Sequence, residues 1–477
     1  MRQDVARLAL SLAGILLFVA PGLGLAEAVR PLRRLPLAVR SAWAYLLGVA
    51  WVAGGAYVAS HVFGASLKRG LFLWLAVLPA LAGLAAALLR RRDAAREASS
   101  SRIRPRDPVA LAALAAAAFV CAGLYAEALR NPLTDWDGRM TWFAQARFVR
   151  EARTVDAAVI RKDRWYLTNR RYPLLLPLAQ IAVQETFDLS DDERTVRPLY
   201  ATFFPAFLLL LWSGAARLAG RRAASLAVLA ASVVPYFAFW NHGGASGGYS
   251  DFPLACFFGA GGLLLLLSRT PAAGLAAGLL LAGAALTKRE GLPAAVACLA
   301  VVGLRELLAR RREGHGTLRT VAIHVLPAFV LVAGAGAFFA HWASDIVRDG
   351  WDDGYMQSLR NLDTWRAFGP RLSRAVPRVL RESFDPAQWG ILWVVLPATL
   401  LFGARAFRRP RVRALAILAL VSPAIGLAAY GVHWDPPALA AVTWGRFLIQ
   451  ASLPTFLVFA AGLGAALGNG SGGDRGR

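Results

Sequence analysis

The chain has 477 residues, of which 57% are hydrophobic and 17% are charged, and its mean hydropathy is +0.48. A soluble globular protein of this length would carry more charge and shorter apolar runs, so that class is excluded. The net charge of +24 does not indicate nucleic-acid binding. Its arginines cluster in short segments between apolar runs, as in proteins that cross a membrane several times.

Apolar runs of about 20 residues recur along the chain and predict membrane-spanning helices. Lipid does not tolerate unpaired backbone groups, so a helix is the expected form of each run. Clear examples are Leu8–Val29, Ala42–Gly64, Val109–Leu129 and Val321–Ala343. The first run could be read as a signal peptide cleaved at Ala26-Glu27-Ala28. It is longer than a signal core and further spans come after it, which favours an uncleaved helix.

Segments rich in arginine alternate with acidic or glycine-rich connections. Because Arg and Lys favour cytoplasmic loops, the segments predicted to face the cytoplasm are Arg30–Arg40, Arg90–Arg106, Arg217–Arg222, Arg305–Arg319 and Arg405–Arg413. Those predicted to face outward are Asp188–Glu193, Gly243–Asp251, Lys288–Glu290, Ser344–Gln388 and Gly431–Thr443. The alternation predicts an all-α, polytopic membrane protein with about 13 transmembrane helices. It places the N-terminus outside and the tail Gly468–Arg477 inside.

These spans and loops divide the chain into five parts: N-terminal spans (1–130), an external loop (131–187), core spans (188–343), a second external loop (344–388), and C-terminal spans with a short tail (389–477). In the first loop, the apolar segment Tyr172–Phe187 is short and holds two prolines. It is predicted to be a partial or surface-lying helix, and whether it crosses the membrane stays open. The short segments Ala272–Leu286 and Leu292–Leu304 flank a charged turn, which predicts a dip to membrane depth that builds a site.

Asp135 and Asp137 lie where an apolar run gives way to the first polar loop. Carboxylates at the edge of a membrane are costly to desolvate, so they tend to be paired or functional. In an extended stretch, residues two apart face the same side, and both acids could address one substrate or cation. Asp137 could instead cap a helix over Gly138–Arg150. We favour function, because a cap needs neither a second acid nor the nearby basic and aromatic side chains, among them Trp142, Arg147 and Tyr172.

Two later segments carry further charged groups. Asp251 comes after the glycine-rich run Gly243–Gly248, which would let the backbone approach a ligand, or Asp251 simply caps the next span. Lys288 is one of only three lysines in the chain. A compact ammonium group at this turn could hold a phosphate or pair with Glu290.

Arg289 and Arg446 are candidate phosphate partners, although an arginine at the end of a span can also snorkel to the interface without a further role. The sequence has no Gly-Lys-Ser/Thr phosphate loop and no dinucleotide fingerprint, which argues against a soluble nucleotide donor. The three cysteines lie in apolar segments and the histidines lack ligand spacing. We therefore assign no disulfide and no metal ligand to them.

Four stretches of the sequence resemble the GT-C superfamily of polytopic glycosyltransferases. Within it, the chain looks like the bacterial branch of dolichyl-phosphate-mannose-type or RgtA/B/C/D-like transferases. In order, the stretches resemble the acidic first external loop, the segment after it, the second acidic loop and a Thr-Lys-Asn-Glu-Gly turn: Asp135–Phe148, Arg171–Leu178, Gly248–Ala255 and Leu286–Leu292. Arg289 stands where asparagine is usual in that turn, and Arg446–Pro454 is a weaker match.

The resemblance implies a sugar donor on a polyprenyl phosphate, used at the outer face of a bacterial cytoplasmic (inner) membrane, and inversion at the anomeric carbon. Asp137, or Asp135, would then accept the proton of the acceptor hydroxyl. Lys288, Arg289 and Arg446 would stabilise the departing phosphate. Asp251 would shape the site, and Trp142 and Trp434 would stack on sugar rings. The acceptor is a glycan, lipid or protein, and members of the family differ in whether they use a divalent cation.

Two other functions fit part of the pattern. A transporter or flippase of lipid-linked sugars would use the same charges without breaking a bond, and it would show repeat symmetry and charges along a path across the bilayer. An O-antigen ligase or polymerase would use Arg and His in a late external loop, for which Ser344–Gln388 is a candidate. The acids gather early in the chain and on one predicted face, which favours the glycosyltransferase.

Overall fold

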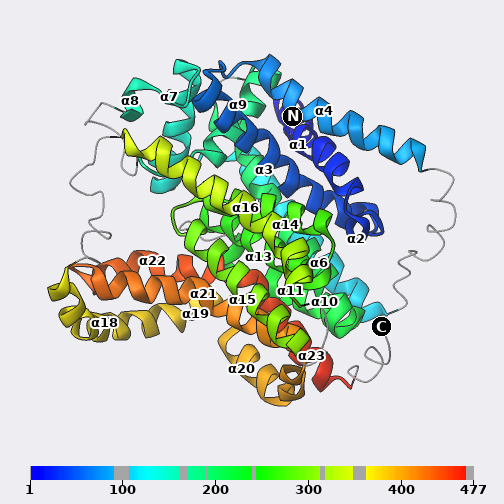
Figure 1. Ribbon diagram of the computed structural model, residues 1–477, viewed down its shortest axis with the longest axis vertical. Coiled ribbons are helices and arrows are strands. Elements are labelled where there is room, and N and C mark those ends of the chain that lie inside the picture. The colour runs from blue at the N-terminus through cyan, green and yellow to red at the C-terminus, as the bar shows by residue number, and fades with distance from the viewer. Residues whose placement is uncertain are drawn as a thin grey trace.

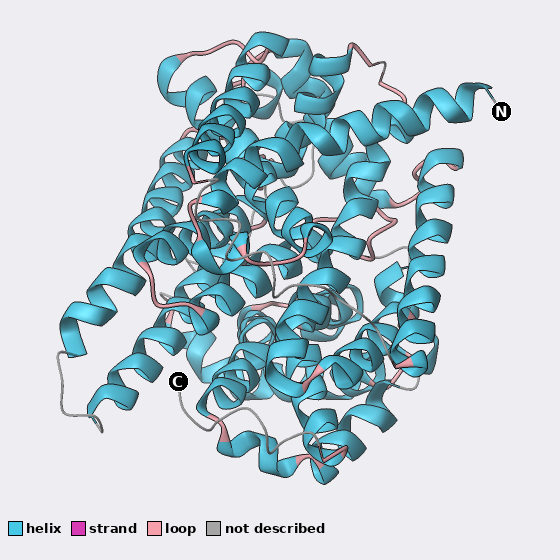
Figure 2. Ribbon diagram, turned by 90° about the vertical axis from the view of Figure 1, so that its right-hand side faces the viewer, coloured by secondary structure: helices cyan, strands magenta, loops and turns pink. Residues whose placement is uncertain are grey.

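The computed structural model describes residues 2–90, 107–161, 170–189, 191–238, 243–311, 317–346, 361–390 and 392–468. Every regular element in these ranges is a helix (Figure 1, Figure 2), which confirms the all-α prediction. The predicted basic segment Arg90–Arg106 lies outside the described residues after Arg90, as do His242, His315 and the tail after Gly468.

Eight of the described helices are long and apolar enough to cross a membrane, so the chain is a polytopic helical membrane protein. They are α1 (Arg2–Glu27), α3 (Leu37–Phe63), α4 (Arg69–Leu89), α6 (Pro108–Arg130), α10 (Glu193–Ala219), α15 (Gly291–Arg311), α16 (Thr317–Ser344) and α21 (Pro410–Val432). The pair α22 (Pro436–Gln450) and α23 (Ser452–Ala466) qualifies as one further span, bent by 56°. The total of about 13 spans stays a prediction.

The other described helices connect or cover these spans. Three are apolar but shorter: α13 (Asp251–Leu267), α14 (Pro271–Thr287) and α20 (Leu392–Phe402). The rest are α2 (Arg30–Arg33), the π-helix η2 (Gly138–Phe143), α7 (Ala144–Ala152), α8 (Ala158–Arg161), α9 (Leu175–Phe187), α11 (Arg221–Ser232), α12 (Pro235–Ala238), α18 (Leu362–Ser383), α19 (Pro386–Trp389) and the 3-10 helix η3 (Ala404–Arg408).

Basic and acidic connections lie at opposite ends of the bundle. Arg409, from one basic segment, donates a hydrogen bond to the carbonyl of Leu218 at the end of α10 (2.8 Å). At the start of α10, the Glu193 carboxylate accepts a hydrogen bond from the backbone of Leu133 in the first acidic loop (3.2 Å). Since α10 has 27 residues and a helix rises about 1.5 Å per residue, these ends are about 40 Å apart. We call them the basic end and the acidic end.

The predicted charged turn lies between α14 and α15, but only α14 is short, because α15 has 21 residues and is one of the eight candidate spans. α13 and α14 pack against each other, and Asp251 at the start of α13 meets Lys288 directly after α14. α15 then begins at Gly291. A Cβ atom there would lie 1.9 Å from the carbonyl oxygen of Ala284, so only glycine permits this close approach to α14. α15 runs on to Arg311, beyond the predicted apolar segment.

The apolar segment in the first loop forms α9, whose 13 residues are too few to cross a membrane alone. The prediction of a partial helix is therefore confirmed. The alternative of a surface-lying helix is wrong, because nearly all its side chains are buried and it packs against α3, α4, α7 and α10.

The second predicted external loop, 344–388, contains the 22-residue helix α18, which is not among the helices apolar enough to cross a membrane. Pro370 and Pro377 lie inside α18, and internal prolines made a helix a poor expectation there. Asn361 caps α18 by accepting a hydrogen bond from the backbone of Asp363 (2.9 Å). One face of α18 packs on α21 and α22 at one side of the bundle (Figure 1). Residues 347–360 lie outside the described part of the chain.

Candidate functional site

A buried carboxylate, that of Asp251, organises the acidic end. Its exposed fraction is 0%. Oδ1 accepts hydrogen bonds from Lys288 Nζ (2.7 Å) and Gln450 Nε2 (2.7 Å), and Oδ2 accepts one from Arg446 Nε (2.8 Å). Ser250, not Asp251, is the N-cap residue of α13. The alternative of a plain helix cap is therefore wrong, and Asp251 instead holds two cations, one from the turn after α14 and one from α22.

Arg446 joins Asp251 to the first acidic loop. While Nε faces Asp251, Nη1 donates to Asp137 Oδ2 at 2.8 Å. The guanidinium carbon also lies 5.0 Å from the ring centre of Tyr249, within the range of a cation–π contact. A snorkelling arginine would point to the interface, so that alternative is wrong. We call Asp137, Asp251, Lys288 and Arg446 the charged cluster.

Asp137 opens a helical turn. Its φ of −61° and ψ of −38° are helical, and the turn continues as the π-helix η2. The prediction that Asp135 and Asp137 share one side of an extended stretch is therefore wrong. Asp137 also makes no capping hydrogen bond. This turn packs closely against the glycine-rich loop at Gly138. A Cβ atom at that position would lie 2.4 Å from the carbonyl oxygen of Gly247. π-helical turns are frequent at functional sites.

Asp135 lies in the loop just before that turn and is only 5% exposed. Burial raises the pKa of Asp135 from its ordinary 3.8 to about 7, while the charge of Arg197 lowers it and the charges of Glu127 and Asp137 raise it. A carboxyl group that titrates near neutral pH is suited to accept a proton during a reaction. Asp135 therefore differs in chemistry from Asp137, whose carboxylate faces a cation.

Lys288 and Glu290 lie in the turn between α14 and α15. Lys288 is 3% exposed, and its ammonium group lies 2.7 Å from Asp251 and 3.3 Å from Glu290 Oε1. Pairing with Glu290 is thus confirmed, but the shorter contact is with Asp251. Because the ammonium group is buried between two carboxylates, Arg446, whose side chain is 12% exposed, is the better-placed cation for a ligand.

Arg289, Tyr172 and Trp142 form a stack beside the cluster. The Arg289 guanidinium lies 5.1 Å from the Tyr172 ring centre, and its Nε donates to the carbonyl of Arg171 (3.3 Å). The Tyr172 and Trp142 rings stack at 5.5 Å between centroids with an angle of 16°. Trp142 is 0% exposed. The prediction that Trp142 stacks on a sugar is therefore wrong, since its face is already covered by Tyr172.

Two predicted site residues lie away from the cluster. The Arg147 side chain is 63% exposed and pairs with Glu151 (3.1 Å) and Asp191 (3.9 Å) on the surface. Its place in the site is therefore not supported. Trp434 is 75% exposed and precedes α22 by two residues. Arg446 stands ten residues into that helix, which is about 15 Å along its axis.

Three residues of the site region escaped prediction from the sequence. Gln450 and Tyr249 contact Asp251 and Arg446 directly, but neither belongs to a charged pattern. Arg197 is 3% exposed and donates to Glu127 Oε1 (2.8 Å) and to the carbonyls of Asn131 (2.7 Å) and Ser246 (3.0 Å). It ties the end of α6, the first acidic loop and the glycine-rich loop together. Among so many arginines, no sequence signal set it apart.

The two carboxylates of the charged cluster are already paired with cations of the chain. In the part of the chain that the structure describes, no three His, Cys, Asp or Glu side chains gather in a way that could hold a metal. The carboxylates of Asp137 and Asp251 face Arg446 instead. The guanidinium of Arg446 therefore lies between the two acids, and we assign no step to a metal.

No protein-family model matches the chain, and no curated protein or solved structure matches it. The family resemblance of the sequence motifs stays a prediction. Function must be inferred from the chemistry of the charged cluster itself.

Proposed function

We propose that the chain is an integral membrane glycosyltransferase with a GT-C-like arrangement of about 13 spans. It would transfer a sugar from a polyprenyl phosphate to an acceptor hydroxyl at the outer face of a bacterial cytoplasmic membrane. The observation that carries the proposal is the charged cluster. The carboxylates of Asp137 and Asp251 meet the cations of Lys288 and Arg446 at the acidic end, about 40 Å from the basic end.

The cluster and its neighbour Asp135 suit the two tasks of an inverting transfer. The Asp135 carboxylate accepts the proton of the acceptor hydroxyl as its oxygen bonds to the anomeric carbon. The bond from that carbon to the phosphate oxygen breaks, and the polyprenyl phosphate leaves with the electron pair. Arg446 stabilises the charge that develops on this phosphate. Asp137 is the alternative base, and Arg289 a second candidate for the phosphate.

Asp251 fixes Arg446 for this role. It is fully buried, whereas the contact between Arg446 and Asp137 is partly open, with side chains 12% and 23% exposed. A phosphate that approaches from solvent would therefore compete with Asp137 for one edge of the guanidinium, while Asp251 keeps the other edge in place. Arginine is suited to such a two-edged contact because its donors form a planar fork.

Donor-dependent transfer by the purified protein tests the proposal. With a labelled sugar on polyprenyl phosphate, we expect label to move to an acceptor fraction. We expect Arg446→Lys to lower donor use about ten- to a hundredfold, because one charge-assisted contact is worth about 1.5–3 kcal/mol and lysine lacks the fork. The acceptor KM should change little, and the matched control Arg147→Lys should behave as wild type. Label that crosses vesicles while still lipid-linked would identify a flippase instead.

Single-cysteine labelling in intact cells tests the orientation. In a chain whose native cysteines are replaced by alanine, Trp136→Cys reports the acidic end and Arg222→Cys the basic end. Both positions are exposed, at 65% for Trp136 and 53% for the Arg222 side chain. We expect a membrane-impermeant maleimide to label Trp136→Cys in intact cells and Arg222→Cys only after permeabilisation, because arginine-rich loops stay in the cytoplasm. The reverse pattern would contradict the proposed face of action.

A further inference from the structure

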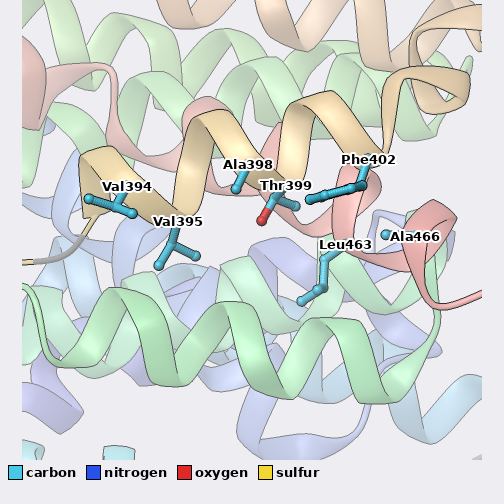
Figure 3. Close-up of a pocket in the computed structure, with 7 residues that line it drawn as sticks. All are labelled: Val394, Val395, Ala398, Thr399, Phe402, Leu463 and Ala466. Atoms are coloured by element: carbon cyan, nitrogen blue, oxygen red, sulfur yellow. The ribbon is translucent and has the colours of Figure 1, made fainter.

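An open apolar groove of about 480 Å³ lies between α20 and α23 (Figure 3). Its walls are Val394, Val395, Ala398, Thr399, Phe402, Leu463 and Ala466. All but one of these side chains are apolar, and two of them, Val394 and Phe402, are more than 70% exposed. In water such a surface would be costly. In a protein that crosses a membrane, it fits a hydrocarbon chain.

The groove ends at a strongly basic segment. α20 finishes at Phe402, and η3 begins two residues later and packs on α23. η3 carries Arg405 and Arg408, both exposed. The chain from 392 to 413 and from 452 to 468 has no Asp or Glu. No acidic side chain from the two segments that form the groove therefore neutralises these arginines.

An apolar groove that ends at paired cations matches the two parts of an anionic lipid. We propose that this groove binds one anionic phospholipid, with an acyl chain between α20 and α23 and the headgroup phosphate at Arg405 and Arg408. The volume falls in the range of about 300–1,000 Å³ that is common for ligand sites. Arginine matches the geometry of a phosphate, and basic residues beside a span attract anionic lipids.

The site would hold the short helix α20 in place. α20 has 11 residues, too few to cross a membrane, and it packs on the rest of the described chain mainly through α23. Leu401 and Phe402 at its end are 75% and 76% exposed. A lipid chain along the groove would cover Phe402 and fill the space between the two helices, in a position separate from the proposed catalytic cluster.

Native mass spectrometry of the delipidated full chain in detergent tests the proposal. Phosphatidylglycerol, phosphatidylcholine and glycerol 1-phosphate would be titrated separately. We expect phosphatidylglycerol to bind more tightly than phosphatidylcholine. The double variant Arg405→Gln/Arg408→Gln should weaken phosphatidylglycerol binding by about thirtyfold, from about one kcal/mol for each cation near a lipid surface. The matched control Arg374→Gln/Arg381→Gln removes two exposed arginines from α18 and should leave binding unchanged.

A second pair of variants tests the groove itself. Ala398 and Ala466 line it and are exposed, so Ala398→Phe/Ala466→Phe fills the groove without disturbing the core. We expect this variant to lose at least tenfold in affinity for both lipids. Unchanged lipid binding in either double variant would overturn the proposal. Glycerol 1-phosphate that binds as tightly as the lipid would show a free phosphate site instead. A dimer that Ala398→Phe/Ala466→Phe dissociates would show that a second copy covers the groove.

Discussion

Asp251→Ala is expected to reduce the free energy of unfolding by about 3–5 kcal/mol, the usual cost of removing one partner from a buried ion pair. The Asp251 carboxylate is 0% exposed and accepts hydrogen bonds from three side chains. Without it, the Lys288 ammonium and the Arg446 guanidinium would lie near each other with less negative charge to balance them. Thermal unfolding of the purified protein in detergent would show this as a lower Tm.

Two further variants make this result specific. Asp251→Asn keeps an oxygen acceptor but removes the charge, so we expect a smaller loss than for alanine. Asp363→Ala is the control, because the pair of Asp363 and Arg366 is 81% exposed on both sides and exposed pairs contribute little. If Asp251→Ala lowers the Tm no more than Asp363→Ala, the charged cluster does not stabilise the fold.

The sequence alone allows the prediction that Asp137, Asp251, Lys288 and Arg446 come together. The reason is that successive membrane spans run in alternate directions. Helices that cross a layer return their ends to the same two faces, so loops separated by an even number of crossings meet at one end. The charges in these loops then stand out against apolar surroundings. Which charge contacts which could not be anticipated, because a salt bridge depends on side-chain direction as well as on the end of the bundle.

Trp142 and Arg147 show where closeness in the sequence misleads. Both come soon after the two acids in the chain, which is why the sequence groups them with the site. Five residues along a helix turn through about 500°, so the two side chains point in different directions. α7 buries Ala146 and Val149 and leaves Arg147 outside. The π-helical turn η2 also shifts the phase of α7, and no residue pattern in the sequence announced it.

Gln450 shows a different reason why a site residue could not be predicted from the sequence. It ends α22, directly before the bend of 56° to α23, and there it donates to Asp251. In the sequence, the residues from Pro436 to Ala466 read as one apolar stretch with a single arginine. α22 packs against α21, its neighbour in the chain, and against α13 and α18, which are distant in the chain. Contacts between elements that are distant in the chain therefore decide which polar side chain faces the site.

Asp135→Asn is expected to lower the rate of sugar transfer by about 10²–10⁴-fold, the usual contribution of a general base. The reason is that burial raises the pKa of Asp135 to about 7, which places a proton acceptor close to neutral pH. A base must be ionised to act, so the wild-type rate should rise with pH up to about 7 and level off above it. The rate of Asp135→Asn should lack this rise, and initial rates between pH 5 and 9 would show the difference.

Stability separates the loss of chemistry in Asp135→Asn from a loss of fold. Since the folded-state pKa of Asp135 exceeds its ordinary value of 3.8, the folded protein holds a proton between about pH 4 and 7 that the unfolded chain releases. Ionisation of this group therefore destabilises the fold as the pH rises. Asp135→Asn cannot ionise there, so at pH 8 it should melt no lower than wild type although it is inactive. Normal turnover in Asp135→Asn, together with an inactive but folded Asp137→Asn, would instead make Asp137 the base. Normal turnover in both variants would remove the carboxylate mechanism.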